Sequence, residues 1–259
     1  MKFFDFFFKQ SPPPKVVNNS LDPFRNGMAH IPSGSFDMGD TFGEGMKSEL
    51  PVHAVTVYSF YLSKFPVTLG QWEQIIGVTS KSFQKNKALP AGSVSWDETK
   101  AFIAKLNSIT GRAYRLPSEA EWEFAAREGG KKIRFGNGKN IANPTEMNFN
   151  PTLKDSYSLA GIYRQEAVAV DTFPPNSLGL YDMCGNLFEW CEDVWHNTYE
   201  GAPNDSAAWI DDGDQSKRVI RGGCVAYSAS GCRATVRDRG PRGGGGYTSG
   251  FRIAHDYPM

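Results

Sequence analysis

Apolar residues recur at helical spacing in two stretches of the chain. The first covers residues 96–107 and ends before Gly111, a residue type that commonly follows a helix. The second begins at Ser118, and the Ser118–Glu121 spacing is that of a capping box. The apolar side chains that would face the core are Phe102, Ile103 and Leu106 in the first stretch and Trp122, Ala125 and Ala126 in the second. This pattern predicts two helices.

Strand patterns are shorter than the helical ones. Residues 52–62 alternate between apolar and polar positions, and residues 219–220 and 251–253 are brief apolar runs next to glycines. The 27 glycines and 16 prolines favour turns over long regular elements. Together these patterns predict an irregular α+β fold with two main helices, short antiparallel strands and many loops.

The chain divides into a short tail and one domain. Residues 1–27 form the tail, with five phenylalanines between positions 3 and 8, and residues 28–259 contain no linker-like stretch. We expect the Phe-rich tail either to pack on its own domain or to dock on a partner. Because charged residues and prolines interrupt it, the tail does not resemble a signal peptide, and we expect a cytoplasmic protein.

Charge excludes some functions and suggests an internal pairing. The chain has 28 Lys and Arg against 28 Asp and Glu, and this balance argues against nucleic-acid binding. The chain also contains no apolar stretch long enough to span a membrane. Residues 189–214 hold acidic side chains but no Lys or Arg, whereas residues 217–252 are rich in arginine. We expect these segments to neutralise each other, with Arg221 and Arg233 bound to carboxylates of the first. The alternative is a binding face supported by arginines.

The segment 182–190 is the strongest candidate for a metal site. Calcium prefers carboxylate and carbonyl oxygens from one compact loop. Asp182 and Glu189 can supply side-chain oxygens, while Gly185 and Leu187 can offer backbone carbonyls. The alternative is a turn in the core whose acids pair with arginines. The four cysteines, at 184, 191, 224 and 232, lack the clustered spacing of a zinc site, and we expect reduced thiols.

A series of motifs resembles the formylglycine-generating-enzyme or sulfatase-modifying-factor family over residues 28–254. They occur in the family's order, and the resemblance implies an irregular variant of the C-type lectin fold. The motifs are Ile31–Gly39, Phe65–Thr68, Arg115–Glu123, Phe173–Asn176, Gly185–Trp190, Arg221–Gly223 and Gly250–Arg252.

The resemblance also bears on metals. It implies a structural calcium ion at Asp182, Gly185, Leu187 and Glu189, since these match one of the family's calcium loops. The family's enzymes oxidise a substrate cysteine to formylglycine with copper held by two cysteines five residues apart. Here the second position is Cys232, but the first is Tyr227, and Cys224 lies three residues too early. Copper(I) requires soft thiolate ligands, which a phenol does not replace.

The C-terminal region has an unusual composition. Residues 218–258 contain no Lys, Gln, Glu, Met or Trp, although these types make up 47 of the 259 residues and about seven would be expected there. No codon ending in C or T encodes any of the five, as expected when the adenines of Asn codons are randomised. This resembles the variable proteins of diversity-generating retroelements, whose Arg-Gly-Gly, Cys-Arg, Arg-x-Arg and Gly-Phe-Arg motifs are all present between residues 221 and 252.

The resemblance implies a variable region at residues 224–249 with eleven display positions. These match Asn-coded sites of the variable proteins and would carry the ligand-binding side chains. The display positions are Ala226, Tyr227, Ser228, Gly231, Asp238, Gly240, Pro241, Gly244, Gly246, Tyr247 and Thr248.

The sequence therefore predicts a non-enzymatic variable protein that binds an unknown protein or cell-surface ligand through these positions. The alternative is a formylglycine-generating oxidase that acts on a sulfatase cysteine, for which copper would be needed.

Overall fold

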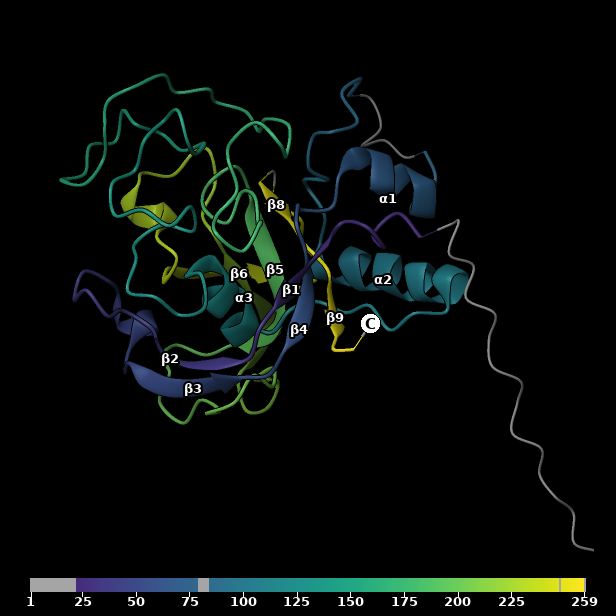
Figure 1. The fold of residues 1–259 in the computed structure, drawn as a ribbon, viewed down its shortest axis with the longest axis horizontal. Coiled ribbons are helices and arrows are strands. Elements are labelled where there is room, and N and C mark those ends of the chain that lie inside the picture. The colour runs from purple at the N-terminus through teal and green to yellow at the C-terminus, as the bar shows by residue number, and fades with distance from the viewer. Residues whose placement is uncertain (1–21, 79–83, 247, 259) are drawn as a thin grey trace, which may run out of the picture.

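The computed structural model describes residues 22–78, 84–246 and 248–258. The Phe-rich cluster and the display position Tyr247 lie outside these residues. Within them, short strands form three small sheets and three α-helices pack between and beside the sheets, joined by long loops (Figure 1). The prediction of an irregular α+β fold is confirmed. No helix in this part of the chain combines the length and apolar character needed to cross a membrane.

Two of the sheets are built mainly from strands near the N-terminus of the chain. Strand β4 (Phe60–Ser63) pairs antiparallel with β1 (Met28–Ile31) and with β9 (Ala254–Asp256), and β2 (Gly34–Met38) pairs antiparallel with β3 (His53–Val57). The alternating stretch 52–62 is thus two strands in different sheets rather than one. The chain leaves one sheet and enters the other between β3 and β4, and periodicity alone does not mark this change.

The third sheet carries most of the C-terminal region. It contains β5 (Phe188–Trp195), β6 (Asp214–Arg221), β7 (Arg237–Pro241) and the short β8 (Ser249–Gly250), in the order β7-β6-β5-β8. β5, β6 and β7 are antiparallel neighbours, whereas β8 is parallel to β5. The predicted strand at 251–253 is wrong, because these residues form the irregular connection between β8 and β9, although they are buried.

Both predicted helices are present and begin at hydroxyl caps. α2 (Trp96–Thr110) starts after Ser95, and α3 (Glu119–Ala126) starts after Ser118, which accepts a hydrogen bond from the backbone N–H of Glu121 at 3.1 Å. A third helix, α1 (Leu69–Ile76), was not predicted from the sequence, and it packs against α2. Two 3-10 turns, η2 (Lys47–Glu49) and η4 (Ser230–Cys232), complete the regular elements of the described chain.

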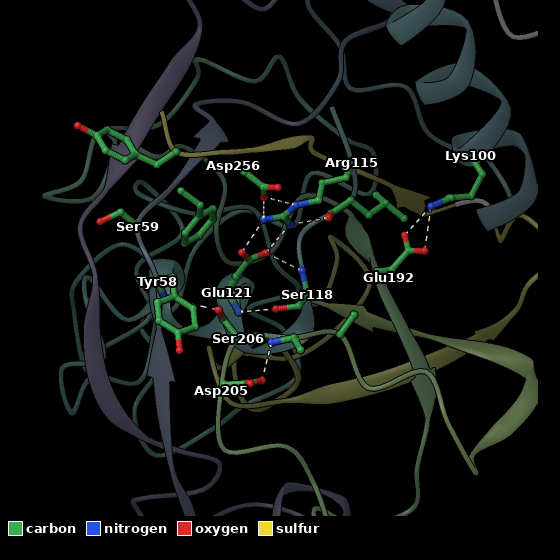
Figure 2. Close-up of a pocket in the computed structure, with 15 residues that line it drawn as sticks. Tyr58, Ser59, Lys100, Arg115, Ser118, Glu121, Glu192, Asp205, Ser206 and Asp256 are labelled. Carbon is green, nitrogen blue, oxygen red and sulfur yellow. Dashed lines mark hydrogen bonds and ion pairs between the residues drawn. The ribbon is translucent and has the colours of Figure 1, made fainter. Parts of the chain in front are cut away.

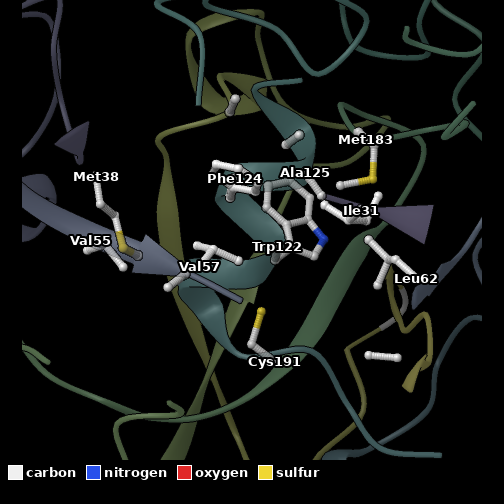
Figure 3. Close-up of a cluster of buried hydrophobic side chains, with 14 of the residues drawn as sticks. Ile31, Met38, Val55, Val57, Leu62, Trp122, Phe124, Ala125, Met183 and Cys191 are labelled. Atoms are coloured by element: carbon white, nitrogen blue, oxygen red, sulfur yellow. The ribbon is translucent and has the colours of Figure 1, made fainter. Parts of the chain in front are cut away.

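α3 runs through the main hydrophobic core. Trp122 is fully buried among side chains from β1, β3 and β4, and Figure 3 shows it near the centre of the cluster. A second cluster surrounds Phe251, which contacts the rings of Phe102 and Trp72 at centroid distances of 5.3 and 6.3 Å. The two clusters lie on either side of the four-stranded sheet and fix the position of its strands.

The charged segments do not neutralise each other as predicted. Glu189 does pair with Arg252, and Asp214 with Lys217. Three other buried arginines of the C-terminal region, Arg221, Arg233 and Arg237, reach carboxylates far earlier in the chain. Arg221 pairs with Glu119 and Glu123 of α3, and Arg233 pairs with Glu49 of η2. The prediction that Arg221 and Arg233 bind carboxylates of residues 189–214 is therefore wrong.

Candidate functional site

Four buried arginines anchor the C-terminal region to the body of the protein, and we call them the frame arginines: Arg221, Arg233, Arg237 and Arg252. Each lies within the core with at most 4% of its surface exposed. Each makes an ion pair with a glutamate that is itself at most 3% exposed. Charges buried this deeply are tolerated only where they are paired and hydrogen-bonded.

Glu119 links two frame arginines to the first turn of α3. Arg237 donates from Nε and Nη2 to the two oxygens of Glu119 at 2.6 and 2.7 Å, and Arg221 donates from Nη1 at 3.2 Å. Burial acts to raise the pKa of Glu119, but Arg237 and Arg221 outweigh it and hold this pKa below its ordinary value. The carboxylate therefore stays ionised and the strands β6 and β7 stay fixed to α3.

The other two frame arginines use the same bidentate geometry. Arg233 donates to both oxygens of Glu49 at 2.9 Å, and Arg252 donates to both oxygens of Glu189 at 2.6 and 2.7 Å. Paired N–H donors in one plane give the strongest and most directional arginine–carboxylate contacts. The backbone on both sides of the predicted variable region is thus fixed by side chains that belong to the interior.

The display positions have the opposite character. All ten that the structure describes are partly or fully exposed. Between residues 229 and 237 most of the interleaved residues are buried, whereas Arg239, Arg242, Gly243 and Gly245, which are not display positions, are exposed. The buried interleaved residues include Ala229, Cys232, Arg233, Ala234, Thr235 and Arg237. The positions lie on the loop that follows β6, on β7 and on the loop that follows β7. Side-chain exposure therefore largely separates display from frame positions over residues 226–238, but not over residues 239–246, where every residue is at least partly exposed.

Two aromatic side chains of β5, Phe188 and Trp190, lie on the core side of display positions Tyr227 and Gly240. The ring of Tyr227, which is 41% exposed, stands edge-on against Phe188 with centroids 5.0 Å apart. Trp190 lies beneath Gly240 and donates from its indole N–H to the Val94 carbonyl at 2.9 Å. Partial burial raises the pKa of Tyr227, and the nearby Asp238 carboxylate adds to this effect. Tyr227 is consequently a neutral phenol at physiological pH, with both apolar and polar surface to offer.

The glycines of this region differ in the space around them. A Cβ at Gly246 would have only the Ser249 hydroxyl nearby, at 3.9 Å. A Cβ at Gly245, which is not a display position, would lie 2.8 Å from the backbone of Ser93. A Cβ at Gly240 would lie 2.4 Å from the buried Trp190 ring. Gly246 can therefore accept side chains, while Gly240 is a display position that cannot vary without moving Trp190.

A cavity of about 1070 Å³ opens beside the display positions. It is lined by Thr248 and Val225 on one side and by residues 165–169 and 84–93 on the other. Leu187, a predicted calcium ligand, also lines it. Thr248 is the one display position of the described residues that lines this cavity, whose size is close to that of typical ligand sites.

A second cavity, of about 620 Å³, lies away from the display positions (Figure 2). Its charged side chains pair with each other: Arg115 lies between Glu121 and Asp256, and Lys100 binds Glu192. None of the described display positions lines this cavity. Its polar groups satisfy one another, so the geometry does not favour it as the functional site.

The predicted calcium ligands lie on one loop but have different surroundings. Glu189 is fully buried and accepts from Arg252 and from the Trp122 indole N–H at 2.7 Å. Asp182 contacts the Asn186 amide at 3.3 Å, and burial raises the pKa of Asp182 to about 8. The oxygens of Asp182 retain the capacity to bind a cation, whereas Glu189 already has a positive partner. The set fits calcium in part, through Asp182 and the loop carbonyls.

The family's copper position does not fit the residues present. Tyr227 occupies the first ligand position, and Cys232 and Cys224 are both fully buried. Burial raises the pKa of the Cys232 thiol well above its ordinary value, and its Sγ donates to the Cys224 carbonyl at 3.7 Å. Copper(I) binds thiolates, and here the second position is a protonated thiol and the first is a phenol.

Comparison with known proteins identifies close relatives of this fold. The family model of the sulfatase-modifying factor enzyme 1-like domain matches residues 15–257. The serine/threonine-protein kinase Pkn1 of Chlamydia trachomatis is 29% identical over 260 residues, covering 90% of this chain but 39% of that protein. The chain thus spans about two fifths of the length of the chlamydial relatives it matches. The formylglycine-generating enzyme of Streptomyces coelicolor is 28% identical, with 89% of each chain covered.

Two solved structures resemble the model over most of their length. PvdO from Pseudomonas aeruginosa is 30% identical with a TM-score of 0.73, and the match covers 88% of this chain and 94% of that one. Treponema denticola variable protein 1 has the same TM-score and coverage at 22% identity. The second likeness shows a shared fold.

Several residues that shape the site were not recognised from sequence. Phe188 and Trp190 were read as neighbours of a calcium loop, but they form the floor beneath Tyr227 and Gly240. Their position in an aromatic strand of mostly buried residues was the available signal. The sequence left Gly245 out of the display positions but gave no sign of its close approach to Ser93, because a contact between residues far apart in the chain leaves no local pattern.

Proposed function

Because the chain belongs to the sulfatase-modifying factor enzyme 1-like family, and because its display positions are exposed on a frame of buried ion pairs, we propose a recognition function. The protein binds a protein or cell-surface ligand through the display positions and is not an enzyme. The observation that carries this proposal is that the ten described display positions are at least partly exposed, while the residues between 229 and 237 that hold the segment to the core, among them Arg233 and Arg237, are mostly buried.

This separation suits a surface whose side chains change while the fold stays constant. The frame arginines fix the backbone from inside, so an exposed side chain contributes little to folding. Tyrosine is an efficient contact residue because it presents a large rigid area with few rotatable bonds. Tyr227 would supply much of the contact area in this chain, whereas Gly244 and Gly246 would supply little.

The finer proposal is a variable protein of a diversity-generating retroelement. Residues 218–258 lack all five residue types that randomised Asn codons do not encode. The fold shared with Treponema denticola variable protein 1 is compatible with it. Gly240 does not support this origin, because a side chain there would lie 2.4 Å from the buried Trp190 ring and the position could vary only if that ring moved.

The nucleotide sequence tests this origin. We expect a nearby copy of the segment encoding residues 224–249 in which the display codons read AAC or AAT, next to a reverse-transcriptase gene. Frame codons, such as those of Arg233 and Arg237, should be identical in the two copies and serve as the internal control. A genomic neighbourhood with neither feature would contradict the variable-protein origin and leave the recognition function to be tested separately.

The alternative function, formylglycine generation, is tested by an assay for the aldehyde. We expect the purified protein, supplied with copper(I) and oxygen, not to convert the cysteine of a sulfatase-derived peptide, because Tyr227 stands where a thiolate is needed. The formylglycine-generating enzyme of Streptomyces coelicolor, assayed by mass spectrometry under the same conditions, is the positive control. Turnover by the protein at a comparable rate would refute the non-enzymatic proposal.

We also propose that Asp182, with the carbonyls of Gly185 and Leu187, binds calcium, while Glu189 stabilises the loop through Arg252. Removal of calcium should lower the melting temperature, since a ligand that binds only the folded state stabilises it. At a calcium concentration about a hundredfold above Kd, the melting temperature of a chain of this size should be roughly 5–10 °C higher than without calcium. Asp182→Ala should remove the dependence on calcium. Identical melting curves of the unsubstituted protein in chelator and in millimolar calcium would refute the site.

A further inference from the structure

Arg218 on β6 differs from the frame arginines, because no carboxylate of the described chain lies within ion-pair distance of it. It is only 7% exposed. Its Nη1 donates to the backbone carbonyls of Gln215 and Lys217 at 3.1 and 3.0 Å, and its Nε is buried with no hydrogen-bond partner among the described residues. A buried guanidinium without an anion is costly, and such a group marks a place where an anion is favourable.

Two further cations gather with Arg218 around one indole ring. The guanidinium of Arg218 lies 4.5 Å from the centroid of Trp96, and Lys100 and Arg242 lie 5.2 and 5.4 Å from it. We call Trp96, Lys100, Arg218 and Arg242 the Trp96 patch. Burial lowers the pKa of Arg218, and the positive charge of Arg242 lowers it further. The nearby carboxylates of Glu192, Asp97 and Asp193 act in the opposite direction but do not outweigh these two effects.

The carboxylates near the patch do not complete it. Asp97 binds Arg242 at 2.8 Å and Glu192 binds Lys100 at 2.8 Å, and these ion pairs are partly exposed. A third carboxylate, Asp193, is near enough to influence Arg218 but accepts hydrogen bonds from the backbone N–H groups of Glu119 and Trp209. Arg218 is therefore the cation of the patch that has no ion pair with a described carboxylate. The patch also lies at the N-terminus of α2, whose helix dipole favours a negative charge there.

The patch adjoins the display positions. In the four-stranded sheet Arg218 is paired with Gly240 of β7, and Arg242 follows the display position Pro241 directly. The backbone N–H of Asp97 donates to the Arg242 carbonyl at 3.1 Å, which holds the end of β7 against the start of α2. A ligand that covers Gly240 and Pro241 would therefore reach the patch.

We propose that the Trp96 patch is an anion-binding subsite that receives an acidic group of the recognised ligand, with Arg218 as the principal contact. The proposal rests on the recognition function and names one chemical feature of the ligand: a carboxylate, sulfate or phosphate group. Arg218 does not belong to the display positions, so this contact would stay constant while the display side chains set the remaining specificity. Guanidinium groups suit planar and tetrahedral oxyanions equally through paired N–H donors.

The test uses the full chain with simple anions as probes. At constant ionic strength in chloride, sulfate should raise the melting temperature along a saturable curve. Arg218→Met should weaken the apparent affinity for sulfate about tenfold or more, because a charge-assisted contact is lost. Lys217→Met is the matched control, since Lys217 is the exposed neighbour that pairs with Asp214, and it should leave the curve unchanged.

A second variant distinguishes binding from a folding defect. Asp97→Asn removes the carboxylate that competes for Arg242 and should tighten sulfate binding several-fold. Arg218→Met itself should melt in chloride no lower than the unsubstituted protein, because it removes a buried charge that has no partner. The proposal is refuted if sulfate acts no differently from chloride or if Arg218→Met keeps the full response.

A titration with acetate under the same conditions distinguishes a sulfate or phosphate group from a carboxylate as the acidic group of the ligand. A response to sulfate at much lower concentration than to acetate would identify sulfate or phosphate groups as the ligand chemistry. Equal responses would identify carboxylates. Both outcomes support the subsite, and neither depends on the genomic test of the variable-protein origin, so the two proposals fail separately.

Discussion

The ion pairs between α3 and the frame arginines are the interaction on which the rest of the structure depends. Glu119 and Glu123 lie one turn apart on α3 and together hold Arg221 and Arg237, which belong to neighbouring strands. Removing one member of such a buried pair leaves an unpaired charge and typically costs about 3–5 kcal/mol. The pairs therefore fix β6 and β7 to the core without using any exposed side chain.

This arrangement accounts for the character of the segment 226–246. Its stability derives from inward-facing residues, and its outward-facing residues rest on the floor of Phe188 and Trp190. The surface can therefore change its side chains at most positions without changing the fold. Gly240, Gly231 and Gly244 are exceptions, because a Cβ there would overlap the rings of Trp190, Tyr227 and Pro241 respectively. In the proposed function, exposed side chains of this segment would contact the ligand while its buried side chains stabilise the fold.

Local sequence patterns predicted the structural features that depend on residues close together in the chain, such as the helices. The capping box at Ser118 and the apolar faces of the two helical stretches predicted α3 and α2, and the display positions that the structure describes are all at least partly exposed. Contacts over long sequence separations were not predictable. Glu119 and Arg237 are 118 residues apart, and no pattern within either segment specifies the other. The same holds for the division of residues 52–62 between two sheets.

The central claim is that display positions are energetically independent of the frame, and chemical denaturation of single variants tests it most directly. Tyr227→Ala, Asp238→Ala and Gly246→Ser should each change the free energy of unfolding by no more than about 1 kcal/mol, as exposed substitutions usually do. Arg237→Met and Gly245→Ala should each cost about 3 kcal/mol or more, through an unpaired Glu119 and a backbone clash with Ser93. Equal losses in the two groups would show that the display positions belong to the core and would contradict the account.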